Sequence, residues 1–185
     1  MNRSKTEIRS DIISKRSELD DLEVEKLSME ICRRVLEVPE VSSVESIAIY
    51  LSHRKEVMAQ LLLAPLIERG VTVFVPIMRN DEMSFSRIGS LDELKDGAHG
   101  ISEPIKIDET DADRIRIFIV PGITFDKSGH RIGWGKGTYD KLFAKNIGSF
   151  RIGLCYDFQV VDAIPQEEHD EMVDMVITET RVIRP

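Results

Sequence analysis

Long apolar runs are missing from this 185-residue sequence, and cysteine and tryptophan are scarce. No stretch approaches the length of a membrane-spanning helix, and the first residues lack the apolar core of a secretion signal. The two cysteines, Cys32 and Cys155, lie far apart in apolar surroundings and lack the spacing of a metal site. We therefore expect two buried thiols in a cytoplasmic protein without a membrane partner.

An excess of positive charge is also missing. The chain has 25 Lys and Arg against 33 Asp and Glu, which gives a formal net charge of −8. This balance disfavours a nucleic-acid partner and requires any anion site to be a local concentration of cations. The share of apolar residues, 42%, is ordinary for a globular protein. The length predicts one domain over residues 1–185.

Helix and strand patterns alternate along the chain. Apolar stripes predict helices over residues 4–17, 21–36, 57–70 and 138–145, the first with Ser4 as its N-cap. Short β-branched runs predict strands over residues 46–52, 71–76, 83–88, 114–122, 150–156 and 172–180. Residues 89–113 are polar and predict a surface loop. This alternation predicts an α/β fold with a mainly parallel sheet covered on both faces.

A glycine-rich loop, "GHRIGWGKGTYDKLF" (residues 129–143), stands between a predicted buried strand and a predicted helix. Exposed backbone N–H groups and a helix N-terminus suit an anion such as phosphate. The loop departs from the nucleotide P-loop pattern because Gly137 follows Lys136 directly. It departs from the dinucleotide fingerprint because Thr138 takes the place of the third glycine. A tight turn without a ligand remains the alternative.

Side chains near this loop have two interpretations each. Lys5 and Arg9 share one helix face and either bind a phosphate or simply face solvent. Asp140 either favours the dipole of its helix or holds Mg²⁺. Glu56 either accepts hydrogen bonds from a donor-rich heterocycle, or is a loop residue or a charge at a helix N-terminus. Trp134 has the flat ring that stacks on a flat ligand.

Polar residues follow several predicted strands. The segments "YLSHRKE", "VPIMRND", "VPGITFD" and "CYDFQ" each begin at a strand end. The carboxyl ends of parallel strands share one edge of a sheet, where ligands bind in α/β folds. We therefore expect these segments to converge on an active site.

The segment "VPGITFDKSGHRIGWGKGTYDKL" resembles the signature of the 5-formyltetrahydrofolate cyclo-ligase family. Weaker matches follow the family's order along nearly the whole chain: Lys5 and Arg9, "YLS" before Glu56, "VP" before Arg79, and His169 with Asp170 and Asp174. The resemblance implies a three-layer α/β/α fold. It also implies ATP- and Mg²⁺-dependent cyclisation of 5-formyltetrahydrofolate to the 5,10-methenyl form, with release of ADP and phosphate.

The resemblance also implies roles for individual residues. The implied ATP-binding set is Lys5, Arg9, Arg131, Ile132, Gly133, Trp134, Gly135, Lys136, Gly137, Thr138 and Tyr139. The implied catalytic residues are Arg131, Tyr139 and Lys136, of which Lys136 would stabilise the transferring phosphoryl group. The implied substrate-binding residues are Leu51, Glu56, Trp134 and Tyr139, and the implied magnesium ligands are Asp140 and Asp170.

Two loop positions depart from the family pattern Gly-Arg-Gly-x-Gly-Tyr-Tyr-Asp. Trp134 replaces its arginine and Thr138 its first tyrosine. Losing a cation beside the phosphates would weaken ATP binding or leave that task to Arg131 and Lys136. Two alternatives stay open: phosphoryl transfer to another reduced pterin or N-formyl compound, and a non-catalytic sensor of a phosphorylated metabolite. The expected partner is a reduced folate, bound by a monomer or weak homo-oligomer.

Overall fold

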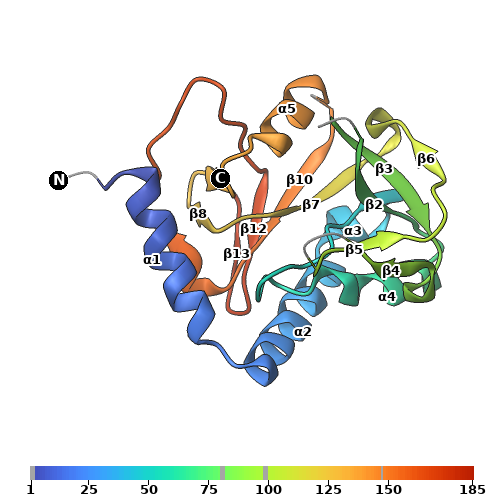
Figure 1. Cartoon of the computed structure of the whole chain (residues 1–185), viewed down its shortest axis with the longest axis horizontal. Coiled ribbons are helices and arrows are strands. Elements are labelled where there is room, and N and C mark those ends of the chain that lie inside the picture. The colour runs from blue at the N-terminus through green and yellow to red at the C-terminus, as the bar shows by residue number, and fades with distance from the viewer. Residues whose placement is uncertain (1–2, 80–81, 98–99, 147) are drawn as a thin grey trace.

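The computed structural model describes residues 3–79, 82–97, 100–146 and 148–185. The strands of its central sheet are β1 (Ser46–Ala48), β2 (Thr72–Arg79), β3 (Glu82–Ile88), β6 (Glu109–Thr110), β7 (Ile117–Pro121), β10 (Phe150–Leu154), β12 (Met175–Ile177) and β13 (Val182–Ile183). They lie in the order β13-β12-β10-β7-β1-β2-β3-β6 (Figure 1). The strands from β12 to β2 are parallel, whereas β13, β3 and β6 join antiparallel. The predicted mainly parallel sheet is confirmed.

Helices cover both faces of this sheet. One face carries α2 (Asp21–Glu37), α3 (Pro39–Ser42), the 3₁₀ turn Ala59–Leu62 and α4 (Leu63–Glu68), and the other carries α5 (Thr138–Lys145). Strand β1 contributes to both layers because successive side chains point to opposite faces. Ile47 packs with Ile31 of α2, whereas Ala48 packs in the cluster that holds Phe143 of α5. The three-layer α/β/α fold is confirmed.

A second, three-stranded sheet lies beside the main one. It consists of β8 (Thr124–Asp126), β9 (Arg131–Ile132) and β11 (Val160–Val161). Helix α1 (Lys5–Glu18) packs near β8 at the side of the molecule (Figure 1). Ile8 and Ile12 of α1 are buried against Ile123, Ile132 and Ile164. The small sheet thus brings α1 to the segment in which the glycine loop begins.

Three features of the structure differ from the predicted helices and strands. The segment 89–113 contains the antiparallel strands β4 (Leu94–Asp96) and β5 (Ser102–Pro104) as well as β6, rather than only a loop. The helix predicted over 57–70 is a 3₁₀ turn followed by the short α4. The strands predicted over 46–52 and 172–180 are pairing segments of only three residues, β1 and β12. Strands this short carry too few residues for an alternating pattern to show.

Among the helices that the structure describes, none has the length and apolar character required to cross a bilayer.

Gly153 of β10 allows a buried aromatic ring to lie against the sheet. A Cβ at this position would be 2.3 Å from Cε1 of Phe125, whose side chain is fully buried. We expect Gly153→Ala to lower the free energy of unfolding by about 1–3 kcal/mol, because the ring must shift inside a packed core. Urea denaturation measures this loss. Gly148→Ala is the control, since nothing lies within 4 Å of its added Cβ. Equal stability of both variants would contradict the prediction.

Candidate functional site

The glycine loop ends at a helix N-terminus that has no capping side chain. Gly135 and Gly137 have φ angles of 92° and 62°, which favour glycine. Gly137 is the N-cap of α5 and caps it with no side-chain hydrogen bond, whereas Ser4 and Asp20 cap α1 and α2. The first N–H groups of α5 therefore remain available to an anion.

Two cations of α1 lie beside this loop. The Lys5 Nζ atom is 2.6 Å from Oδ2 of Asp170. The Nε atom of Arg9 donates to the backbone oxygen of Gly133 at 3.0 Å. The structure thus brings the α1 cations, the glycine loop and the segment around Asp170 together, as the sequence suggested.

Arg131 holds the first turn of α5 in place. Its guanidinium, only 5% exposed, donates from Nη2 to Oδ1 of Asp140 at 2.8 Å and from Nη1 to the backbone oxygen of Glu171. Burial lowers the pKa of Arg131, and the carboxylate of Asp140 opposes that change. The guanidinium is therefore occupied by protein partners, which favours a positioning role over direct phosphate contact.

The two carboxylates named as magnesium ligands lie in linked segments. Besides its bond from Arg131, Oδ1 of Asp140 accepts a hydrogen bond from the Glu171 N–H at 3.2 Å. Glu171 directly follows Asp170 in the sequence. Oδ2 of Asp170 accepts from Lys5 and from the Glu167 N–H at 2.8 Å. Each carboxylate thus keeps one oxygen without a described protein donor. Such oxygens suit Mg²⁺, which takes one or two carboxylates and keeps several waters.

Asp170 also has acidic and imidazole neighbours. Ligand atoms of Glu167, His169 and Asp170 lie within 4.8 Å of one another. Burial raises the pKa of Asp170, but hydrogen bonds from Lys5 and the Glu167 backbone outweigh it and lower that pKa below its ordinary value. The group is therefore a charged carboxylate, as a metal ligand must be.

Glu56 and Trp134 meet on the other side of the loop. The Trp134 Nε1–H donates to Oε1 of Glu56 at 3.0 Å, and the His53 N–H donates to Oε2 at 3.1 Å. The Glu56 side chain is buried, and desolvation raises its pKa, although Arg16 and these donors oppose the rise. The indole is 42% exposed, and the guanidinium carbons of Arg16 and Arg54 lie 5.6 and 5.4 Å from its centroid.

Backbone strain and cross-chain bonds shape the segment that carries Glu56. Arg54 and Lys55 both have positive φ angles, 49° and 59°, which non-glycine residues rarely adopt. The Lys55 ammonium donates to the backbone oxygens of Ser17 and Leu19 at the end of α1. The turn that carries Glu56 is therefore hydrogen-bonded to the end of α1.

The other predicted site residues lie on the glycine loop, at the start of α5 and just after β1. Leu51 is buried just after β1, and the Tyr139 ring packs on Phe143 with centroids 5.8 Å apart. Burial raises the pKa of Tyr139, so its hydroxyl is a protonated donor at neutral pH. Lys136 is exposed at the tip of the loop and Thr138 begins α5.

The expected convergence of four polar segments is correct only in part. "YLSHRKE" reaches Trp134 through Glu56. Asp126 of "VPGITFD" is instead buried and accepts from the N–H groups of Ser128 and His130 at 2.9 and 3.0 Å. Asp157 of "CYDFQ" binds Thr178, Thr180 and Arg181. These carboxylates satisfy turn donors and neighbouring side chains rather than a shared site.

The segment "VPIMRND" departs from the expectation for a different reason. Strand β2 continues to Arg79, which pairs with Glu109 at 3.6 Å, and residues 80–81 lie outside the described residues.

Sequence reasoning also missed Arg16. The signal was present, because Arg16 stands seven residues after Arg9 and hence on the same helix face.

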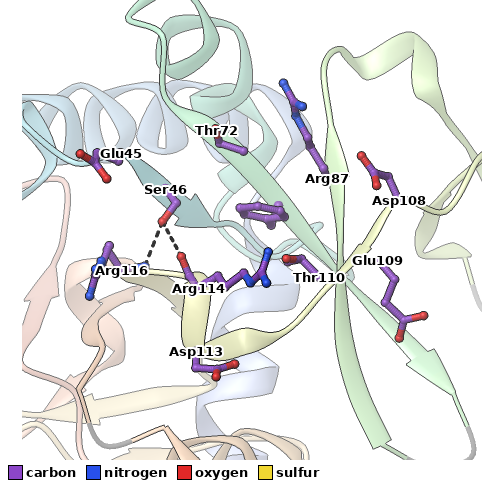
Figure 2. Close-up of a pocket in the computed structure, with 11 residues that line it drawn as sticks. Glu45, Ser46, Thr72, Arg87, Asp108, Glu109, Thr110, Asp113, Arg114 and Arg116 are labelled. Atoms are coloured by element: carbon purple, nitrogen blue, oxygen red, sulfur yellow. Dashed lines mark hydrogen bonds between the residues drawn. The ribbon is translucent and has the colours of Figure 1, made fainter.

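A hollow of about 650 Å³ lies at the opposite edge of the sheet, by the amino ends of β1 and β2 (Figure 2). Ser46 at its wall accepts from the Arg116 N–H and donates to the Arg114 oxygen. Its charged lining has three guanidinium groups and four carboxylates: Arg87, Arg114, Arg116, Glu45, Asp108, Glu109 and Asp113. This lining has a formal charge of −1 and faces away from the glycine loop, so it does not suit a polyphosphate.

Comparisons with known proteins find relatives that match nearly the whole chain. A Schizosaccharomyces pombe protein named probable 5-formyltetrahydrofolate cyclo-ligase is 29% identical over 205 residues, which cover 100% of this chain and 99% of the relative. The Escherichia coli K12 protein named 5-formyltetrahydrofolate cyclo-ligase is 27% identical over 179 residues, covering 92% and 98%. The structure of Aquifex aeolicus 5,10-methenyltetrahydrofolate synthetase matches with a TM-score of 0.87 and 30% identity, covering 97% of this chain and 92% of that one.

A family model gives the same result from the sequence. The model described as the 5-formyltetrahydrofolate cyclo-ligase family matches residues 1–179. The match contains every residue named above on α1, on the glycine loop and around Glu56 and Asp170. The resemblance noted from the motifs is confirmed, and the chain belongs to the 5-formyltetrahydrofolate cyclo-ligase family of enzymes.

Proposed function

We propose that this protein converts 5-formyltetrahydrofolate to 5,10-methenyltetrahydrofolate with consumption of ATP in the presence of Mg²⁺. One observation carries the proposal beyond family membership. The glycine loop lies beside the cations of α1 through Gly133, and its next residue, Trp134, reaches the buried Glu56. An anion site and a carboxylate site for a polar heterocycle therefore meet on one short loop, as a reaction between ATP and a folate requires.

The phosphate half of the site would comprise Lys5, Arg9, Lys136 and the α5 N-terminus. Cations and free N–H groups neutralise and orient phosphate oxygens. The unpaired oxygens of Asp140 and Asp170 would hold Mg²⁺, which supplies further neutralisation of phosphate charge. Lys5 already pairs with Asp170, so it would lie next to both the metal ligand and the phosphates.

The folate half of the site would comprise Glu56, Trp134, Leu51 and Tyr139. A pterin ring carries an amino group and a ring N–H side by side, and a carboxylate can accept from both. Glu56 is already oriented by Trp134 and His53. Stacking on the exposed indole and contact with buried Leu51 would fix the plane of the ring.

The chemistry requires positioning rather than a covalent nucleophile. The formyl oxygen is a poor leaving group, so N10 cannot expel it directly. Transfer of the γ-phosphoryl group from ATP to that oxygen releases ADP. N10 then attacks the formyl carbon and gives up its proton to solvent, and the C–O bond breaks as phosphate leaves. Lys136 would stabilise the charge on the transferring group, while the loop holds both reactants in reach.

We also propose a cytoplasmic enzyme that acts as a monomer or weak homo-oligomer, without nucleic acid or membrane. The acidic net charge of −8 supports the absence of a nucleic-acid partner.

The direct test mixes purified protein with 5-formyltetrahydrofolate, ATP and Mg²⁺ and follows the near-ultraviolet absorbance of the methenyl product. We expect a rise that requires both ATP and Mg²⁺. No rise despite ATP binding would overturn the proposal. ADP release with another reduced pterin or N-formyl compound would then indicate a different substrate, and ATP binding without ADP release would indicate a sensor.

Trp134 provides a binding readout because it is the only tryptophan. We expect 5-formyltetrahydrofolate alone to change its fluorescence, since the indole bonds to Glu56 in the folate half of the site. ATP alone is expected to change it much less. A Trp134→Phe variant gives the background signal. A change produced by ATP and not by the folate would place the indole beside the adenine instead.

A further inference from the structure

Arg16, in the last turn of α1, has a buried charge whose bonding is incomplete. Its side chain is 2% exposed, and no described residue accepts a hydrogen bond from its Nη1 atom. Buried donors on charged groups nearly always have a partner, and leaving one unpaired is destabilising. Such an orphaned donor beside a proposed ligand site indicates that a ligand atom completes its bonding.

The groups around Arg16 leave that donor available. Glu56 is the acidic group that most favours the charged form of Arg16, yet among the described residues it accepts no hydrogen bond from Nη1. The hydroxyls of Tyr50 and Tyr156, which also face Arg16, donate to the backbone oxygens of Val57 and Lys55 at 2.8 and 3.2 Å. Lys55 and Val57 flank Glu56 in the sequence. Both tyrosine hydroxyls therefore bond to the turn that carries Glu56.

The Trp134 indole lies next to both buried groups. The Arg16 guanidinium carbon lies 5.6 Å from the Trp134 centroid, and the Nε1–H of the same indole bonds to Glu56. A ligand ring placed beside this indole, next to Arg16 and Glu56, would meet a guanidinium donor and a carboxylate acceptor together. The pterin edge has the complementary pattern, with a ring carbonyl next to a ring N–H and an amino group.

We infer that Arg16 is a specificity residue for the pterin ring, donating to the ring carbonyl while Glu56 accepts from the adjacent N–H and amino groups. This inference rests on the proposed function, because the pterin belongs to that substrate. If Arg16 only packed against the Trp134 ring, that role would explain its position beside the ring. It would not explain why the Nη1 atom has no hydrogen-bond partner among the described residues.

The experiment measures how strongly Arg16 is coupled to the ring carbonyl. Calorimetric titration gives the Kd of 5-formyltetrahydrofolate and of its analogue with an amino group in place of that carbonyl. Arg16→Met removes the donor but keeps an unbranched side chain that can fill part of the space of the arginine stem. We expect it to shift the ratio of the two Kd values by at least about tenfold toward the analogue, or 1.4 kcal/mol. The Kd of ATP with Mg²⁺ is expected to stay unchanged.

Two further variants make the result decisive. Lys15→Met is the matched control, since its side chain is 54% exposed and pairs with Asp11 on the same helix. Its ratio is expected to equal that of the unaltered protein. Arg16→Lys keeps a cation inside the protein if the methionine variant fails to fold, and is expected to shift the ratio in the same direction.

The outcomes separate this inference from the proposed function. A ratio unchanged in both Arg16 variants overturns the specificity role and leaves the proposed function intact. Equal weakening of both ligands and of ATP also overturns it, because a structural role would produce that pattern. Failure of the unaltered protein to bind 5-formyltetrahydrofolate would overturn the proposed function itself.

Discussion

Replacing Lys136 by alanine is expected to lower kcat by about 100- to 1,000-fold, within the range by which a fixed cation stabilises phosphoryl transfer. Lys136 is exposed at the tip of the glycine loop, between the two left-handed glycines Gly135 and Gly137. No described residue pairs with its ammonium group, so the charge is free to meet the transferring phosphoryl group. Steady-state assay of methenyl product formation measures the effect.

Stability provides the check on this result. Because Lys136 is exposed, the alanine variant is expected to unfold at the same temperature as the unaltered protein. Lys145→Ala is the matched control, since this lysine lies in the last turn of α5 with 73% of its side chain exposed. Its kcat is expected to stay unchanged. Turnover of the Lys136 variant within threefold of the unaltered protein would remove the catalytic role.

Glu56→Gln is expected to raise the KM for 5-formyltetrahydrofolate by about 100-fold, because a buried site made for hydrogen bonding loses an acceptor. The amide keeps the size of the side chain but replaces one oxygen with a donor. That donor would face either the Trp134 Nε1–H or the His53 N–H, which bond to the two carboxylate oxygens. The KM for ATP is expected to stay unchanged, because the contacts near the phosphates involve other residues.

The dependence on pH gives a second measurement of the same group. Desolvation raises the pKa of Glu56 above its ordinary value of 4.5. Only the ionised form accepts both pterin donors, so kcat/KM is expected to fall as the pH drops through this raised pKa. Glu56→Gln is expected to remove that acidic limb. Glu25→Gln, at an exposed position of α2, should retain it. An identical limb in the Glu56 variant would show that another group causes it.

Much of the fold could be predicted because local pattern and final packing agree. Helix α1 begins one residue after the predicted cap Ser4, whose side chain accepts from the Glu7 N–H. Helix α5 has the predicted bounds, residues 138–145. The small sheet could not be predicted, because β9 and β11 are two-residue strands whose partner is β8. Two residues are too few to show the alternation of a strand, and β11 is also distant from β8 in the sequence.

The site was predictable where the chemistry lies within one motif. The glycine loop, Lys5, Arg9 and Asp140 lie together as their motifs suggested. The bond between Glu56 and Trp134 joins residues 78 positions apart, and no spacing rule gives such a contact. The buried pairing of Arg131 with Asp140 was also hidden, since both residue types are usually exposed. Burial and partners had to come from the structure.

Helix α1 has a consequence for how this enzyme would lose activity on heating. Its buried isoleucines pack in the small cluster with Ile123, Ile132 and Ile164, apart from the two larger clusters around the sheet. A helix held by few apolar contacts opens at a lower free energy than the sheet. Opening of α1 would withdraw Lys5, Arg9 and Arg16 from the site at once. Thermal inactivation would therefore follow the detachment of one helix and precede the melting of the sheet.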